Sequence, residues 1–249
     1  MSAREHGAVA PAVRARRFLG AFRLAIAVLE VVALIGNFQY VLSFRLFATQ
    51  NFFSYFTIQS AFFAVVVLVV AGAYALLAPR DPTWLGVVRT IATVYVVVSG
   101  IVFALIVSQA STFDYRMEVP WSDTLLHFVV PTLVLVGWTT DSVLAVNPPV
   151  PWSTVAWVLA YPSAWLVFTQ VRGADVGWYP YFFLDESQVG GWVGVLIGCL
   201  VCLVIFVAIT AVLVAVNRRL WRMAAARRAA PRGTRRRRAP RVDEPAPRR

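Results

Sequence analysis

Residues 190–216 read GGWVGVLIGCLVCLVIFVAITAVLVAV, a run without a single charged side chain. A helix of about 20 apolar residues crosses the hydrocarbon core of a bilayer, so this run is long enough to span it. Lipid offers no partners to backbone polar groups, which makes a helix the expected conformation. The chain of 249 residues is 59% hydrophobic and only 14% charged, whereas a soluble domain carries roughly 25% charged residues. The sequence therefore predicts an all-α, polytopic membrane protein.

Five more apolar runs precede this one, and together they predict a transmembrane bundle of six helices. The predicted spans are about 20–44, 54–77, 86–109, 124–145, 153–170 and 190–216. They form one membrane domain, residues 20–216, between a basic N-terminal segment at 1–19 and an arginine-rich tail at 217–249.

The distribution of arginine predicts the orientation of the bundle. Arg16 and Arg17 precede the first span, Arg80 and Arg89 flank the connection between the second and third, and 218–249 holds 13 arginines against two acids. The connections at the other end are richer in acids than in arginines. Positive charge favours the cytoplasmic side. Both termini are therefore expected in the cytoplasm, with the protein in the plasma (inner) membrane.

The tail cannot bury apolar surface, because it consists largely of arginine, alanine and proline. Such a composition is typical of a disordered segment. Arginines next to a cytoplasmic leaflet bind anionic lipid headgroups, and these are the expected partner. Nucleic acid is not expected, because no aromatic residues are interleaved with the arginines for stacking on bases.

His127 is the one histidine inside a predicted span, and ionisable side chains in a membrane are usually functional. In the predicted topology the second and fourth spans run in the same direction, so Thr57 and His127 lie near the same face of the bilayer. Both lie about 5–6 Å below the boundary, at 1.5 Å per residue. A hydroxyl and an imidazole at one depth suggest a nucleophile and its base. Pro131 lacks the N–H that would bond the His127 carbonyl, so we expect the helix to be disturbed there.

Other polar residues on this side are candidates for supporting roles. Asp123 is four residues before His127, so its carboxylate either orients the imidazole or merely caps the fourth span. Gln59 and Asn51 are candidate donors to an oxyanion. Arg172 either pairs with a substrate carboxylate or anchors in the headgroups.

Several other features have structural interpretations. The loop that contains Trp178, Tyr179 and Tyr181 is more typical of an interfacial aromatic belt than of a pocket. Glu30 and Asp141 lie farther toward the cytoplasmic side, where structural polar contacts or a water pocket are expected. Small residues recur at every fourth position in the last span, which favours close helix packing in the bundle or, alternatively, a dimer face; they are Gly190, Gly194, Gly198 and Cys202.

The residues also exclude several classes of site. A single histidine in the spans cannot supply the two axial ligands of a haem-b bundle. The sequence contains no H-E-x-x-H zinc motif, no G-x-S-x-G elbow and no P-loop. Cys199 and Cys202 are read as small apolar residues rather than a redox or metal pair. No metal or cofactor is expected.

Four stretches resemble a known family. They are FFSYFTIQS at 52–60, WSDTLLH at 121–127, the segment from Tyr161-Pro162 to Arg172-Gly173, and GWYPY at 177–181. They resemble the bacterial six-pass branch related to the androgen-induced gene family, over about residues 20–216. Eukaryotic members are intramembrane threonine hydrolases that cleave fatty-acid esters of hydroxy fatty acids. The resemblance implies that Thr57 is the nucleophile and His127 its base in a lipid-ester hydrolase.

The alternative is a protein without enzymatic activity: a lipid-binding, channel-like or scaffold membrane protein, in which His127 is a proton-linked gate or a structural hydrogen-bonding group. The two hypotheses differ in geometry. An enzyme requires the Thr57 hydroxyl and the His127 imidazole to face each other across a cavity that holds lipid, whereas side chains on opposite faces of the bundle favour the alternative.

Overall fold

The computed structural model describes residues 3–44, 48–112 and 119–229, and every element in these ranges is helical. The elements are α1 (Ala3–Leu42), α2 (Thr49–Phe52), α3 (Phe56–Leu77), α4 (Thr83–Thr112), α5 (Trp121–Thr124), the π-helical turn η1 (Leu125–Val129), α6 (Val130–Leu144), α7 (Thr154–Val176), the 3-10 turn η2 (Phe182–Leu184) and α8 (Trp192–Ala229).

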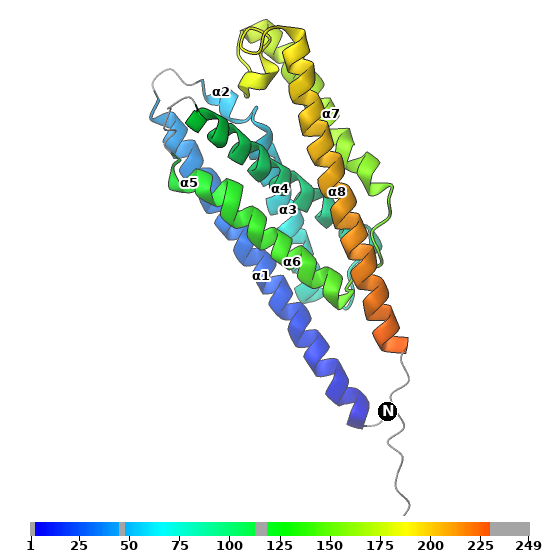
Figure 1. Cartoon of the computed structure of the whole chain (residues 1–249). Coiled ribbons are helices and arrows are strands. Elements are labelled where there is room, and N and C mark those ends of the chain that lie inside the picture. The colour runs from blue at the N-terminus through cyan, green and yellow to red at the C-terminus, as the bar shows by residue number, and fades with distance from the viewer. Residues whose placement is uncertain (1–2, 45–47, 113–118, 230–249) are drawn as a thin grey trace, which may run out of the picture.

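The structure confirms the all-α class, and the described residues contain six helices long and apolar enough to cross a membrane. These spans are Arg14–Leu42, Phe56–Leu77, Thr83–Gln109, Trp121–Leu144, Thr154–Val176 and Trp192–Arg228. The fourth is composite, because α5, η1 and α6 follow one another without a break. In Figure 1, α1 begins and α8 ends at the same end of the bundle, as an even number of spans requires.

The predicted boundary between the last helix and the tail is wrong. Residues 217–229, assigned to a disordered tail, continue α8 as far as Ala229. Alanine, arginine, leucine and methionine are all strong helix formers, so the helix runs on past Val216, where the uncharged run ends. The rest of the predicted tail, residues 230–249, lies outside the described residues.

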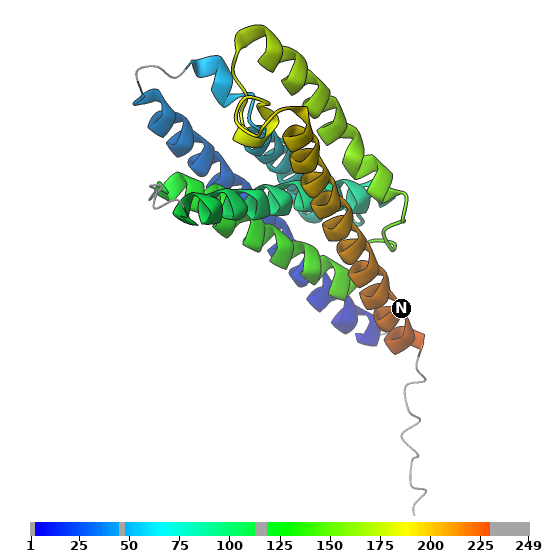
Figure 2. The same cartoon turned by 45° about the horizontal axis from the view of Figure 1, so that its top comes forward.

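Small residues allow α1 and α3 to lie closely side by side. A Cβ at Gly20 would meet Ala75 and Leu76, and one at Gly72 would meet Leu24. Helix α4 contacts α3, α6, α7 and α8. Helices α7 and α8 stand together at the edge of the bundle in both cartoon views (Figures 1 and 2). Much of their apolar surface faces outward, as expected for lipid-facing helices.

A buried network of ion pairs ties α1, α4 and α6 together. Asp141 pairs with Arg23 at 2.5 Å and with Arg89 at 3.1 Å, and Asp81 pairs with Arg16 at 2.5 Å and with Arg89 at 3.4 Å. This confirms the structural role expected for Asp141.

The structure gives no such partner to Glu30. Its carboxyl group is fully buried within α1, and neither oxygen has a hydrogen-bond partner among the described residues.

Candidate functional site

A cavity of about 460 Å³ lies at the end of the bundle away from the ion-pair network. It is lined by residues of α1, α2, α3, α4, α5, η1, α7 and α8, together with the loop before α8. Asn37 lines it, whereas Arg23 of the network lies two heptads earlier on α1, which is about 21 Å at 1.5 Å per residue. Most of the lining is aliphatic and aromatic, so the cavity suits an apolar ligand.

Thr57 lies in the first turn of α3 and presents its hydroxyl to this cavity. Threonine in a membrane helix usually donates to the carbonyl four residues earlier, and Thr90, Thr93 and Thr210 all do so here. The hydrogen bonds of Thr57 Oγ1 go instead to three side chains. The backbone of Tyr55, the N-cap of α3, is extended. No carbonyl of α3 therefore precedes Thr57 by four residues, and its hydroxyl is free to bond to neighbouring side chains.

His127 faces Thr57 in the lining of the cavity, with Nε2 3.4 Å from Thr57 Oγ1. Its other ring nitrogen, Nδ1, lies 3.0 Å from the backbone carbonyl oxygen of Asp123. A carbonyl only accepts, so Nδ1 carries the proton in the neutral ring and Nε2 is left as the acceptor. Phe103 stacks on the imidazole at 3.8 Å between ring centroids and fixes the plane of the ring.

The backbone around His127 departs from the α-helix. Residues Leu125–Val129 form a π-helical turn, in which the N–H of Val130 donates to the carbonyl of Leu125. This is the form that the predicted disturbance at Pro131 takes, and π-turns in helices are often found at functional sites. A Cβ at Gly100 would lie 2.3 Å from the His127 carbonyl oxygen, so α4 and η1 are in backbone contact here.

Two further hydroxyls reach Thr57, and sequence reasoning missed both. Ser99 Oγ of α4 lies 2.8 Å from Thr57 Oγ1. Tyr181 Oη lies 3.4 Å from both Thr57 Oγ1 and the Thr57 amide nitrogen. Ser99 carries no signal of its own in an apolar helix. Tyr181 lies in the GWYPY stretch, but it was assigned to an interfacial belt.

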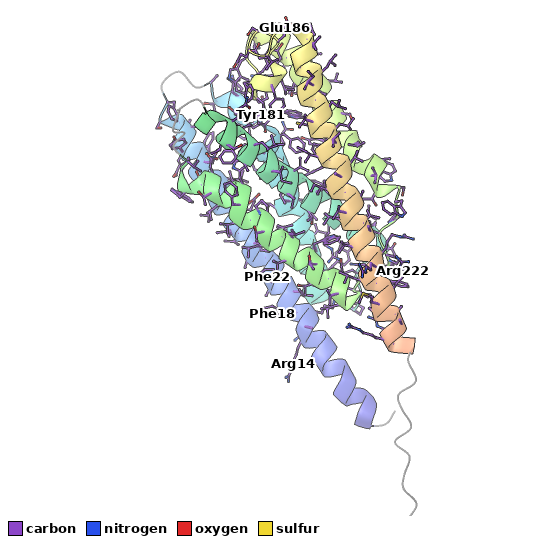
Figure 3. The ribbon with its side chains drawn as sticks, in the orientation of Figure 1. Arg14, Phe18, Phe22, Tyr181, Glu186 and Arg222 are labelled. Atoms are coloured by element: carbon purple, nitrogen blue, oxygen red, sulfur yellow. The ribbon has the colours of Figure 1, made fainter. Side chains whose placement is uncertain are left out.

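For Tyr181 the belt interpretation is wrong. Figure 3 shows Tyr181 on the bundle side of the loop before α8, with Glu186 at the far end of that loop. The Tyr181 ring contacts Tyr55, Trp165 and Phe183. Burial raises the pKa of Tyr181 to about 12, so its hydroxyl stays protonated at neutral pH and can donate a hydrogen bond.

Asp123 supports His127 differently from either expectation. It does not cap the fourth span, because the N-cap is Pro120 and Asp123 is the third residue of α5. Its carboxylate oxygen Oδ1 lies 3.8 Å from His127 Nδ1 and accepts a hydrogen bond of 2.6 Å from Asn37. The backbone carbonyl of Asp123 therefore orients the imidazole, and its carboxylate lines the cavity.

The structure does not bring Gln59 to the site. Gln59 is two residues from Thr57 and points to a different face of α3, since i and i+2 do not share a face. Its amide donates to the Phe53 carbonyl at 2.7 Å and accepts from the Tyr161 hydroxyl. It lines a second, apolar cavity of about 560 Å³ that contains no part of the Thr57–His127 pair.

Asn51 and Arg172 also lie outside the cavity that contains Thr57 and His127, and they are hydrogen-bonded to each other. Arg172 donates to Asn51 Oδ1 at 2.6 Å, and its guanidinium carbon lies 5.4 Å from the Trp178 ring centroid. Neither residue lines the cavity. The hypotheses that Asn51 donates to an oxyanion and that Arg172 binds a substrate carboxylate are not met by this geometry.

The small residues of the last span pack within the molecule. A Cβ at Gly194 would meet the Val189 carbonyl, and one at Gly198 would meet Phe183, so the stripe receives the loop before α8 rather than a helix. Gly190 precedes α8 and has a φ of 75°, a conformation that favours glycine. Cys199 and Cys202 are free and line the cavity. Within the described ranges, no three His, Cys, Asp or Glu side chains gather as a metal site.

In comparisons with known proteins, no family model, no curated protein and no solved structure matches the chain.

Proposed function

We propose that this protein is an integral membrane hydrolase of lipid esters, with Thr57 as nucleophile and His127 as general base. The observation that carries the proposal is the approach of His127 Nε2 to within 3.4 Å of Thr57 Oγ1, in the tautomer that accepts a proton. This distance is somewhat long for a hydrogen bond, as is common for catalytic pairs before substrate binds. The resemblance to the androgen-induced gene family points to the same pair and to fatty-acid esters of hydroxy fatty acids.

The first step follows from the ring orientation. As Thr57 Oγ1 attacks the ester carbonyl carbon, its proton moves to His127 Nε2. The imidazolium that forms keeps its Nδ1–H on the Asp123 carbonyl, and the nearby Asp123 carboxylate stabilises the new positive charge. When the carbon–oxygen bond to the alcohol breaks, the Nε2 proton passes to the alcohol oxygen. Water then attacks the acyl-threonine and gives its proton to His127 Nε2. That proton passes to Thr57 Oγ1 as the fatty acid leaves.

The negative charge that develops on the carbonyl oxygen also needs donors. Two are present beside Thr57: its own amide N–H, in the first turn of α3, and the Tyr181 hydroxyl. They bond each other at 3.4 Å, a long contact that a substrate oxygen can replace. The amide also belongs to a helix N-terminus, where the backbone dipoles favour negative charge.

The cavity suits a lipid. The apolar part of its lining accepts an acyl chain, and the site lies near the ends of the helices, where the headgroup boundary of a bilayer would be. In the orientation that the arginines favour, this is the outer face of the plasma membrane, with both termini in the cytoplasm.

The proposal is tested by labelling the purified protein in detergent with a lipid-like fluorophosphonate, which reacts with activated hydroxyl nucleophiles. We expect the native protein to be labelled, and Thr57→Ala and His127→Ala to lose the label. Thr132→Ala is the matched control, because Thr132 is exposed on α6 and donates to the Phe128 carbonyl.

Circular dichroism and size-exclusion profiles identical to those of the native protein show that each variant is folded. An unlabelled native protein beside a labelled serine hydrolase would refute the proposal and leave the binding, channel or scaffold hypothesis.

A further inference from the structure

Four polar side chains gather at the end of the cavity nearest the helix ends. Asn37 and Tyr40 lie close to the C-terminus of α1, Tyr55 immediately precedes α3, and Asp123 lies in α5. We call these residues the polar cluster. The opposite part of the lining, which includes Val98, Leu203 and Phe206, is apolar. An ester held at Thr57 would therefore have one side in a polar and the other in an apolar environment.

The polar cluster offers mainly hydrogen-bond acceptors. The Asn37 amide donates to Asp123 Oδ1 at 2.6 Å. Asn37 Oδ1 and Asp123 Oδ2 form no hydrogen bond among the described residues. Burial and the nearby Asp123 raise the pKa of Tyr55, so the Tyr55 hydroxyl stays neutral. Neutral tyrosine hydroxyls both donate and accept. This set complements the hydroxyl groups of a ligand.

No arginine or lysine among the described residues that line the cavity supplies a counter-charge for an anion. Among the described residues that line it, none is an arginine, and the chain has no lysine. Arg172, the arginine that the sequence suggested as a ligand for a carboxylate, is held by Asn51 and Trp178 outside the cavity. A carboxylate bound at the polar cluster would lie beside the Asp123 carboxylate, and none of the described lining residues is an arginine or lysine that would offset the two charges. Burying an unpaired charge next to a like charge is strongly unfavourable.

We infer that the substrate is an ester whose alcohol part is uncharged and carries hydroxyl groups, as in an acyl glycerol, and that esters with a free carboxylate on the alcohol part are poor substrates. The acyl chain lies in the apolar part of the cavity, and the hydroxyls of the alcohol donate to Asp123 Oδ2 and Asn37 Oδ1. The inference rests on the proposed hydrolase function. It departs from the substrate class implied by the resemblance, because a hydroxy fatty acid ester ends in a free carboxylate.

The test compares three esters with one acyl chain, using the full-length protein in nanodiscs of neutral lipid. They are oleoyl glycerol, the oleoyl ester of hydroxystearic acid, and the methyl ester of that second compound, which differs from it only in the blocked carboxylate. We expect both neutral esters to be hydrolysed at least about tenfold faster than the free acid, measured as kcat/KM. Turnover of the free acid as fast as that of its methyl ester would overturn the inference.

Two variants test whether the Asp123 carboxylate causes the preference for the methyl ester over the free acid. Asp123→Asn should narrow the ratio between methyl ester and free acid, because it removes the carboxylate but keeps the backbone carbonyl that holds His127. Asp175→Asn removes the same charge from the exposed end of α7, outside the cavity, and should leave the ratio unchanged. An equal effect of the two variants, or no effect of Asp123→Asn, would overturn the role of Asp123.

A third variant covers the case in which Asp123→Asn fails to fold. Asn37→Ala should lower the preference for oleoyl glycerol over methyl oleate, since both are neutral and only the first carries hydroxyls. An unchanged preference would overturn recognition by the polar cluster. Failure of the proposed function looks different: no ester is hydrolysed, or hydrolysis persists in Thr57→Ala.

Discussion

The Thr57 hydroxyl lies closer to Ser99 than to His127, with Thr57 Oγ1 2.8 Å from Ser99 Oγ and 3.4 Å from His127 Nε2. A threonine hydroxyl has one proton and two lone pairs. If Ser99 donates to Thr57, the Thr57 proton is free to point at His127. Ser99 is buried in α4 and has no other hydrogen bond among the described residues, so this donation also satisfies the serine.

Ser99→Ala is therefore expected to weaken hydrolysis without abolishing it. Loss of one positioning hydrogen bond costs about 0.5–1.5 kcal/mol, or roughly two- to tenfold in kcat. Steady-state kinetics on a neutral oleoyl ester would measure this. Complete loss of activity in Ser99→Ala, with activity retained in Thr57→Ala, would make Ser99 the nucleophile instead.

Tyr181→Phe removes one donor to the developing oxyanion and keeps the aromatic ring in its packing. Removal of such a donor lowers kcat by about 10²–10³-fold in other hydrolases; we expect about 10²-fold here, with little change in KM, because the donor acts in the transition state. Tyr179→Phe is the matched control, since Tyr179 packs on Gly173 outside the cavity. A rise in KM at constant kcat would assign Tyr181 to substrate binding.

Gly100→Ala should disrupt the site by displacing the backbone of His127. The added Cβ would lie 2.3 Å from the His127 carbonyl oxygen, which belongs to the backbone and cannot rotate away. Overpacking of this kind typically costs about 1–3 kcal/mol. We expect a lower melting temperature together with loss of fluorophosphonate labelling. Gly137→Ala, whose Cβ would lie 3.4 Å from the Phe22 ring, should be nearly neutral in the same thermal melt.

Asp141→Asn should destabilise the protein strongly. It leaves Arg23 and Arg89 without their shared carboxylate in a buried network. Breaking a buried ion pair from one side costs about 3–5 kcal/mol. Denaturant unfolding in detergent would show the loss, while an effect no larger than that of Asp175→Asn would indicate that the network contributes little.

Glu30→Gln, unlike Asp141→Asn, should not destabilise the protein. The Glu30 carboxyl is fully buried and has no described partner, so a neutral amide of nearly the same shape is no more costly to bury than this carboxyl group. We expect an unchanged or higher melting temperature. A clear decrease would reveal a partner for the carboxyl group that the described residues do not include.

The six spans could be predicted from sequence because hydropathy and helix length alone decide them. The shared depth of Thr57 and His127 followed from topology, since two spans that run in the same direction place equivalent positions at one depth; that the two side chains face each other is shown by the structure. The end of α8 was missed because arginine and alanine favour a helix and are also common in disordered tails.

The side-chain partners were harder to predict. Gln59, Asn51 and Arg172 were selected for their side of the membrane and their side-chain chemistry. The face of each helix decides which residues meet, and that depends on the packing of the neighbours. Ser99 and Tyr181 needed the same information. The role of Asp123 also depended on backbone geometry, because its carbonyl and not its carboxylate bonds the imidazole.

The most direct test is to find the residue that carries the fluorophosphonate. Peptide mass spectrometry of the labelled native protein should place the adduct on Thr57, and His127→Ala should carry none at matched protein and probe concentrations. An adduct on Ser99, or on any residue outside the cavity, would contradict the assignment of Thr57 as the nucleophile.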